Sequence, residues 1–199
     1  MKLALDKKTL RLPLLLAVAA LAVGVSGCSV EHRTTETGVS QIELSAGGEP
    51  YFNVGPVTYQ IQVSRQINPF DPVDVQYFAG VKNAQDLPGT QFWYGVFLWA
   101  KNQSGTDQTT ADTFKLEDSY GDIYTPTVLN PSINPYAWTA ETLDPDAVQP
   151  AAGTTASNGS TGGGLILFKL NETVYSNRPL TLEIFAPGST KPSRVSLDL

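Results

Sequence analysis

Three pairs of closely spaced aspartates are the residues of this sequence whose types and spacing suggest chemistry. They lie in stretches marked by proline or glycine: Asp71 with Asp74, Asp118 with Asp122 beside Glu117, and Asp144 with Asp146. Such carboxylates can hold Ca²⁺, and paired carboxylates can act as acid and base in glycoside cleavage. Aspartate is also common in turns, because its side chain accepts hydrogen bonds from local backbone N–H groups. The order of ligands of an EF-hand is absent, so we interpret these residues as turn residues and predict no metal site.

One histidine and one cysteine limit the other catalytic chemistries. A Ser–His or Cys–His pair would have to use His32, which lies in polar surroundings and is typical of a solvated side chain. A single cysteine excludes an internal disulfide, a CxxC pair and a zinc site built from several thiolates. We therefore predict that the protein is not an enzyme and has no catalytic residue and no cofactor.

The cysteine, Cys28, stands at the end of a segment with the layout of an export signal. A basic start from Lys2 to Arg11 precedes an apolar run over residues 12–25, which is shorter than the roughly 20 residues of a membrane span. The following "VSGC" resembles the bacterial lipobox, which implies cleavage before Cys28 and attachment of a diacylglyceryl group to its thiol. Two or three acyl chains anchor a protein durably. An uncleaved N-terminal anchor and an ordinary secretory signal are the alternatives.

The charge of the chain argues against binding to nucleic acid. The net charge is −6, and removal of residues 1–27 takes away four basic residues and one acidic residue, which leaves −9. A nucleic-acid backbone requires clustered Lys and Arg, whereas the basic residues here are scattered. We predict contact with the membrane through lipidated Cys28 and an envelope protein or glycan as partner.

Two aromatic residues in a long irregular stretch are the candidate partner contacts. Tyr136 and Trp138 lie in "NPYAWT", where no strand pattern explains them. Aromatic residues in loops anchor protein contacts or stack on sugars, but they also cover the open end of a sandwich. The nearby "GSTGGG" over residues 159–164 lacks the lysine and the helix of a phosphate-binding loop, so we interpret it as a flexible linker into a strand.

The elements that would position these residues are strands. Residues 57–67 alternate strictly between apolar and polar, which predicts a strand with one buried face, and residues 91–102 are apolar on both faces. Two short strands over residues 113–117 and 122–125 are joined by "DSYG", where Gly121 suits a positive φ. The remaining expected elements are a short turn of helix or strand within 75–81 and strands at 165–170, 180–185 and 194–199.

This pattern predicts an all-β fold, an antiparallel immunoglobulin-like β-sandwich of about seven short strands. The 14 prolines and 17 glycines favour turns, and no segment has the pattern of an amphipathic helix. A small barrel is the alternative. We expect a signal peptide at 1–27, a lipidated cysteine and disordered tether at 28–56 with a stray strand near 41–44, and the sandwich domain at 57–199.

Residues 93–126 resemble the core of the DUF4352 family of bacterial domains. Its pattern F-x-L-x-D-x-x-G-x-x-Y falls on Phe114, Leu116, Asp118, Gly121 and Tyr124, and "GGGLILFKL" fits a later glycine-rich step into an apolar strand. The resemblance implies an immunoglobulin-like fold in a secreted or lipid-anchored protein. It implies no common chemistry, and some members are thought to bind partners or to assist envelope processes.

Together these observations predict a non-enzymatic binding or interaction domain, anchored by lipid at the extracytoplasmic face of the cell membrane. One alternative is a hydrolase of envelope polymers that uses the carboxylates of Asp71, Asp74, Asp144 or Asp146. The other is a purely structural envelope component.

Overall fold

The computed structural model describes residues 33–34, 40–42 and 51–197. The predicted signal segment, Cys28 and His32 lie outside these residues, as does most of the predicted tether. Within the described part of the chain, no helix has the length and apolar character needed to cross a membrane.

Strands make up most of the described chain, and short helical segments connect some of them. The helical segments are η1 (Val75–Phe78), α1 (Thr155–Asn158) and η2 (Glu172–Tyr175). The strands are β1 (Arg33–Thr34), β2 (Ser40–Ile42), β3 (Phe52–Val54), β4 (Val57–Ile67), β5 (Gln91–Asn102), β6 (Gln108–Thr109), β7 (Thr113–Glu117), β8 (Ile123–Tyr124), β9 (Pro126–Thr127), β10 (Thr142–Leu143), β11 (Val148–Gln149), β12 (Gly164–Asn171), β13 (Leu180–Phe185) and β14 (Pro192–Leu197).

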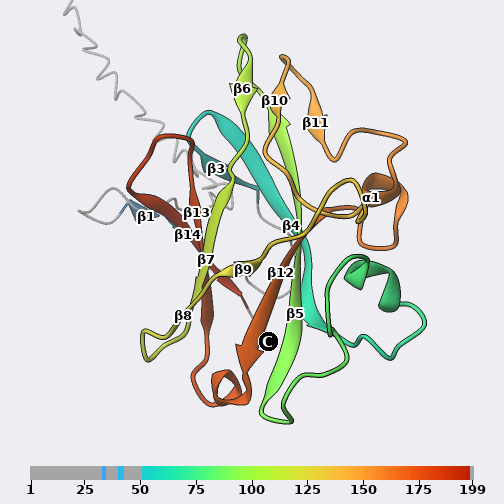
Figure 1. The fold of residues 1–199 in the computed structure, drawn as a ribbon. Coiled ribbons are helices and arrows are strands. Elements are labelled where there is room, and N and C mark those ends of the chain that lie inside the picture. Colours follow the sequence, from blue (N-terminus) through green and yellow to red (C-terminus); the bar gives the residue numbers. More distant parts are fainter. Residues whose placement is uncertain (1–32, 35–39, 43–50, 198–199) are drawn as a thin grey trace, which may run out of the picture. The chain divides into compact units, whose positions relative to one another are not determined.

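Two six-stranded sheets pack into a β-sandwich (Figure 1). Sheet A has the order β1-β2-β14-β13-β7-β8, and sheet B has the order β3-β4-β5-β12-β9 with β11 also paired to β5. All pairings within the two sheets are antiparallel except that of β14 with β2. Strands β6 and β10 form a separate two-stranded ribbon. The predicted all-β sandwich is confirmed.

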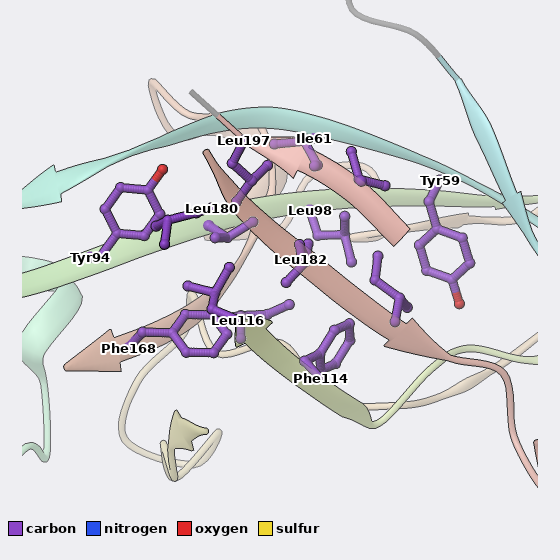
Figure 2. Close-up of a cluster of buried hydrophobic side chains, with 14 of the residues drawn as sticks. Tyr59, Ile61, Tyr94, Leu98, Phe114, Leu116, Phe168, Leu180, Leu182 and Leu197 are labelled. Carbon is purple, nitrogen blue, oxygen red and sulfur yellow. The ribbon is translucent and has the colours of Figure 1, made fainter. Parts of the chain in front are cut away.

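The main core lies between the two sheets. From β5, Phe92, Tyr94, Val96 and Leu98 point toward sheet A, where leucines such as Leu116 meet them. Figure 2 shows this layer of side chains from both sheets. Each fully buried side chain of this size stabilises the fold by about 1.5–3 kcal/mol, so this layer holds the two sheets together.

A second core covers the other face of sheet B. There Trp93 and Phe97 of β5 pack with Tyr77 of η1 and with Tyr136, which lies in the stretch between β9 and β10. The rings of Tyr77 and Phe97 lie 4.9 Å apart, edge to face. This second layer explains why residues 91–102 are apolar on both faces, as predicted for a central strand.

Strand β4 departs from the prediction of one buried face. The pairing with β5 shifts between Ile61, which lies opposite Leu98, and Val63, which lies opposite Phe97. Gln62 is the extra residue of this β-bulge, and a one-residue insertion moves all following side chains to the other face. As a result Ile61 belongs to the core between the sheets, while Val63 packs against the second core.

Three other features of the chain's organisation differ from expectation. Strand β3 at Phe52–Val54 pairs with β4, so the sandwich begins before the predicted start at Val57. Strand β2 confirms a short strand near 41–44 and adds to sheet A beside β14, within the segment expected to be a tether. The glycine-rich stretch is close-packed and not a flexible linker: a Cβ on Gly163 would lie 2.9 Å from the backbone N of Leu98.

Candidate binding groove

Asp118 acts as the cap of the hairpin turn between β7 and β8. Its Oδ1 accepts the N–H groups of Tyr120 and Asp122, each at 3.0 Å, and its Oδ2 accepts the amide of Asn177 at 2.9 Å. Burial raises the pKa of this carboxyl, but the hydrogen bonds from Asn177 and the turn outweigh it and hold the pKa below its usual value. Gly121 has φ +91°, as predicted for this turn.

Asp74 is bound in an ion pair that ties the segment after β4 to that strand. Both of its carboxylate oxygens accept hydrogen bonds from the guanidinium of Arg65, and Oδ2 also accepts the N–H of Asn68 at 2.9 Å. Burial raises the pKa of Asp74, but Arg65 and Asn68 outweigh it and lower the pKa overall. Its neighbour Asp71 is exposed and accepts the N–H of Val73 at 2.7 Å, as a turn residue does.

The third pair, Asp144 and Asp146, lies exposed after β10. Asp146 contacts Lys101 at 3.4 Å, and Glu117 contacts Arg194 at 3.3 Å. Across the described residues, no three His, Cys, Asp or Glu side chains come together as they would around a metal ion.

The structure places Tyr136 in the second core, which corrects its assignment as a candidate partner contact. Its side chain is buried, its ring lies 4.9 Å from that of Tyr77, and its hydroxyl donates to Oε1 of Gln76. Its N–H donates to Oδ1 of the buried Asn134 at 3.0 Å. Tyr136 therefore packs η1 against sheet B, and its ring is not available to a partner.

Trp138 lies only partly buried and is held from several directions. Its indole N–H donates to the carbonyl of Ala111 at 2.8 Å, and its backbone N–H donates to the carbonyl of Leu165 at 2.9 Å. The ring of Phe114 stands perpendicular to it at 6.2 Å. A Cβ on Gly164 would lie 2.8 Å from Cε3 of Trp138, so the absence of a side chain there makes room for the indole.

An open groove of about 510 Å³ adjoins Trp138. It lies between β7 of sheet A and the β9–β12 side of sheet B. Figure 1 shows the course of these strands. Its walls are mostly apolar with threonines among them: Asp112, Thr113, Phe114, Lys115, Thr125, Pro126, Thr127, Val128, Leu129, Pro131, Trp138, Thr139, Ala140, Leu165, Ile166 and Leu167. Ligand sites typically have this volume and this mixture of apolar walls with a few polar groups.

The groove exists because the chain leaves sheet A after β8. The ladder of β8 with β7 pairs Tyr124 with Leu116, and its continuation would bring Pro126 opposite Phe114. Proline has no N–H to donate to a ladder. The chain instead crosses to sheet B, where Pro126 pairs with Phe168 of β12, and the space beside β7 stays open.

Sequence reasoning identified Trp138 but missed the other side chains of the groove. Val128 is 95% exposed at its rim, and Lys115 lines it from β7. A sequence signal that could have indicated the groove is Pro126, which directly follows the short strand expected at 122–125 and cannot continue the pairing of that strand. A second hollow of about 510 Å³ lies beside η1, but its walls come from residues 69–86 alone and include no strand edge.

No protein-family model matches the chain, and no curated protein matches it. Solved structures with a similar arrangement include a protein of unknown function from Listeria monocytogenes, with 14% identity, a TM-score of 0.46, and coverage of 74% of this chain and 80% of that one. A candidate lipoprotein of Bacillus subtilis has 12% identity and a TM-score of 0.45, over 76% of this chain and 39% of that one. An uncharacterised β-sandwich protein of Clostridium difficile has 12% identity and a TM-score of 0.43, over 80% of this chain and 96% of that one. Similarity at this level carries no information on ligands or site residues.

Proposed function

We propose that this protein is a non-enzymatic binding domain, anchored by lipid at the extracytoplasmic face of a bacterial membrane, and that its ligand occupies the groove beside Trp138. The observation that carries the proposal is the groove itself: an open space of about 510 Å³ with largely apolar walls. From the resemblance of residues 93–126, we also propose that the domain is related to the DUF4352 family.

The held position of Trp138 supports a binding role for this groove. The indole N–H is bound to Ala111 and the backbone N–H of Trp138 is bound to Leu165. Together these bonds hold the side chain in place before any ligand arrives. A ligand that meets a fixed aromatic wall loses less conformational freedom on binding than one that must order a mobile side chain. The nearby Tyr59 hydroxyl accepts the N–H of Ala111 at 2.8 Å, which holds the same backbone from the other side.

The anchor is proposed from the sequence alone. The basic start, the short apolar run and the "VSGC" that ends at Cys28 are the features that support lipidation. The acidic remainder of the chain suits an exported domain that does not adhere to anionic lipid headgroups.

The carboxylates considered for a hydrolase do not form an acid–base pair in the groove. An acid–base pair needs carboxylates that face a substrate, yet Asp74 is already bound to Arg65 and Asp118 caps a turn. Asp144 and Asp146 are exposed on a loop and do not line the groove.

Fluorine NMR of the full chain in lipid nanodiscs tests the groove. Tryptophan is replaced by fluorotryptophan, and the signals of the three tryptophans are assigned from single Trp-to-Phe variants. Benzyl alcohol, which carries an aromatic ring and one hydroxyl, is the probe. We expect the Trp138 signal to move saturably, while those of Trp93 and Trp99 stay in place.

A matched pair of variants locates the probe. Ala140→Phe fills the groove and should abolish the shift, whereas Ala152→Phe, on an exposed loop outside the groove, should leave it unchanged. A Trp138 signal that does not respond, or that responds equally in both variants, would contradict the binding site.

The mass of the N-terminal peptide of membrane-extracted protein tests the anchor. We expect an acylated peptide that begins at Cys28 and is absent from a Cys28→Ala variant. An unmodified thiol with Met1 still attached would disprove lipidation.

A further inference from the structure

The outer edge of β7 is open where it borders the groove. Strand β8 pairs only with Leu116 and Glu117, and among the described residues no strand pairs with this edge over the preceding Thr113–Lys115. Unpaired strand edges are templates for another extended chain, which can add its own strand to the sheet.

The backbone N–H and C=O of Phe114 face this open edge. The N–H of Asp118 donates to the carbonyl of Asp122, on the β8 side. Because alternate residues of an antiparallel strand bond to the same neighbour, Leu116 and then Phe114 also face that side. The N–H of Ser119 donates to the carbonyl of Asn177, on the opposite side, which agrees with this alternation.

Lys115 gives the open edge a charge preference. The two neighbouring acidic residues, Glu117 and Glu183, contact Arg194, and among the described residues Lys115 forms no ion pair. Its ammonium instead lies 5.3 Å from the centre of the Phe185 ring. An acidic side chain directly opposite Lys115 on an added strand would form a favourable cross-strand pair.

We infer that the ligand is an extended peptide that adds an antiparallel strand to the open edge of β7, with an apolar residue opposite Phe114 and an acidic residue immediately before it, opposite Lys115. The inference rests on the proposed function, since it names the ligand class of the same groove. The apolar side chain points, like that of Phe114, between the sheets and toward Trp138. The peptide thereby occupies the ladder position from which Pro126 is excluded.

The probe is the blocked hexapeptide Thr-Thr-Glu-Phe-Thr-Thr, titrated against the fluorotryptophan-labelled full chain in nanodiscs. We expect a saturable shift of the Trp138 signal. Methylation of the phenylalanine amide nitrogen removes the donor that pairs with the Phe114 carbonyl, and affinity should fall about tenfold. Methylation of the next amide nitrogen, which points away from β7, is the matched control and should have little effect.

Charge reversal tests the register. Lys115→Glu should lower the affinity for the peptide about fivefold. The same variant should prefer a peptide with lysine in place of glutamate. Lys82→Glu makes the same change of net charge on an exposed loop away from the groove and should leave both peptides unchanged.

The outcomes separate this inference from the proposed function. If benzyl alcohol shifts the Trp138 signal but the peptide does not, or if both methylated peptides bind equally well, strand addition is wrong and the binding site stands. If Lys115→Glu does not change the preference between the peptides, the register is wrong. If no probe moves the Trp138 signal, both proposals fall.

Discussion

At the scale of the residue, most of the side chains that could take part in chemistry instead form hydrogen bonds that hold the fold together. Asp118 accepts two N–H groups of its turn, and Asp74 accepts from Arg65 and Asn68. Trp138 differs, because its indole N–H is bound to Ala111 while its ring borders the groove. A residue with one side fixed and one side toward open space is suited to recognition.

Replacement of Trp138 by phenylalanine should destabilise the protein by about 1–3 kcal/mol, because the carbonyl of Ala111 loses its donor. Urea unfolding followed by circular dichroism measures this change. Trp99→Phe, at a partly buried ring that contacts Tyr51 and belongs to neither core, is the control and should cost less. Equal midpoints for wild type and the Trp138 variant would contradict the structural role of the indole.

The lowered pKa of Asp118 predicts a loss of stability in acid. The unfolded chain takes up a proton on this carboxyl near pH 3.9, above the pKa of the folded protein. The contribution of Asp118 is therefore present above about pH 4 and is lost as the pH falls through the folded pKa. Asp118→Asn should be less stable than wild type at pH 7, and the difference should shrink below about pH 4.

Unfolding by urea across pH 2.5–7 checks this prediction, with Asp112→Asn at an exposed site as the control. A difference between wild type and Asp118→Asn that stays constant with pH would show that the carboxylate is not stabilised in the fold.

At the scale of the element, close approach of backbone governs the region around the groove. Gly163 and Gly164 let the start of β12 pass against β5 and the indole of Trp138. The bulge at Gln62 divides β4 between two cores. Pro126 ends the pairing of β8 and moves the chain from sheet A to sheet B. Each of these features depends on one or two residues, yet it changes the course or the pairing of a whole strand.

Gly163→Ala should destabilise the fold by about 1–3 kcal/mol, since its Cβ would meet the backbone of Phe97 and Leu98 at 2.9 Å. Gly105→Ala is the matched control, because no atom lies within 4 Å of its Cβ position. Thermal and urea unfolding of the two variants measure the difference. If Gly163→Ala is as stable as Gly105→Ala, the close packing of this stretch is wrong.

At the scale of the whole sandwich, sheet B is shared by two cores. Leu98 and Leu116 meet between the sheets, while Phe97, the neighbour of Leu98 on β5, packs on the opposite face. Because one strand contributes to both layers, loss of either layer removes support from the other. The described domain should therefore unfold as one cooperative unit.

Leu116→Ala and Phe97→Ala test this cooperativity, one in each core. Each should lower the free energy of unfolding by about 2–5 kcal/mol and keep a single transition. Tryptophan fluorescence and far-ultraviolet circular dichroism should give the same midpoint for each variant. Separate transitions for the two probes in the Phe97 variant would mean that the second core unfolds independently.

Sequence by itself determined the strands with strong local signals. The apolar run at 91–102, the hairpin around Asp118 and the positive φ of Gly121 follow from periodicity and turn chemistry, which act over a few residues. The change of face in β4 could not be predicted, because a bulge depends on the pairing with β5 and leaves the alternation of the sequence intact. The burial of Tyr136 likewise depends on Tyr77, far away in the chain.

The candidate site divides in the same way. Trp138 stood out in the sequence as an aromatic residue in an irregular stretch, whereas its groove is formed by β7, β9 and β12, which only the tertiary structure brings together. Proline's missing N–H is visible at position 126, but its consequence requires the register of β7 with β8, whose continuation would have brought Pro126 opposite Phe114. Local sequence patterns determined the strands and turns. Pairing between residues far apart in the chain decided which faces are buried and which strand edges stay open.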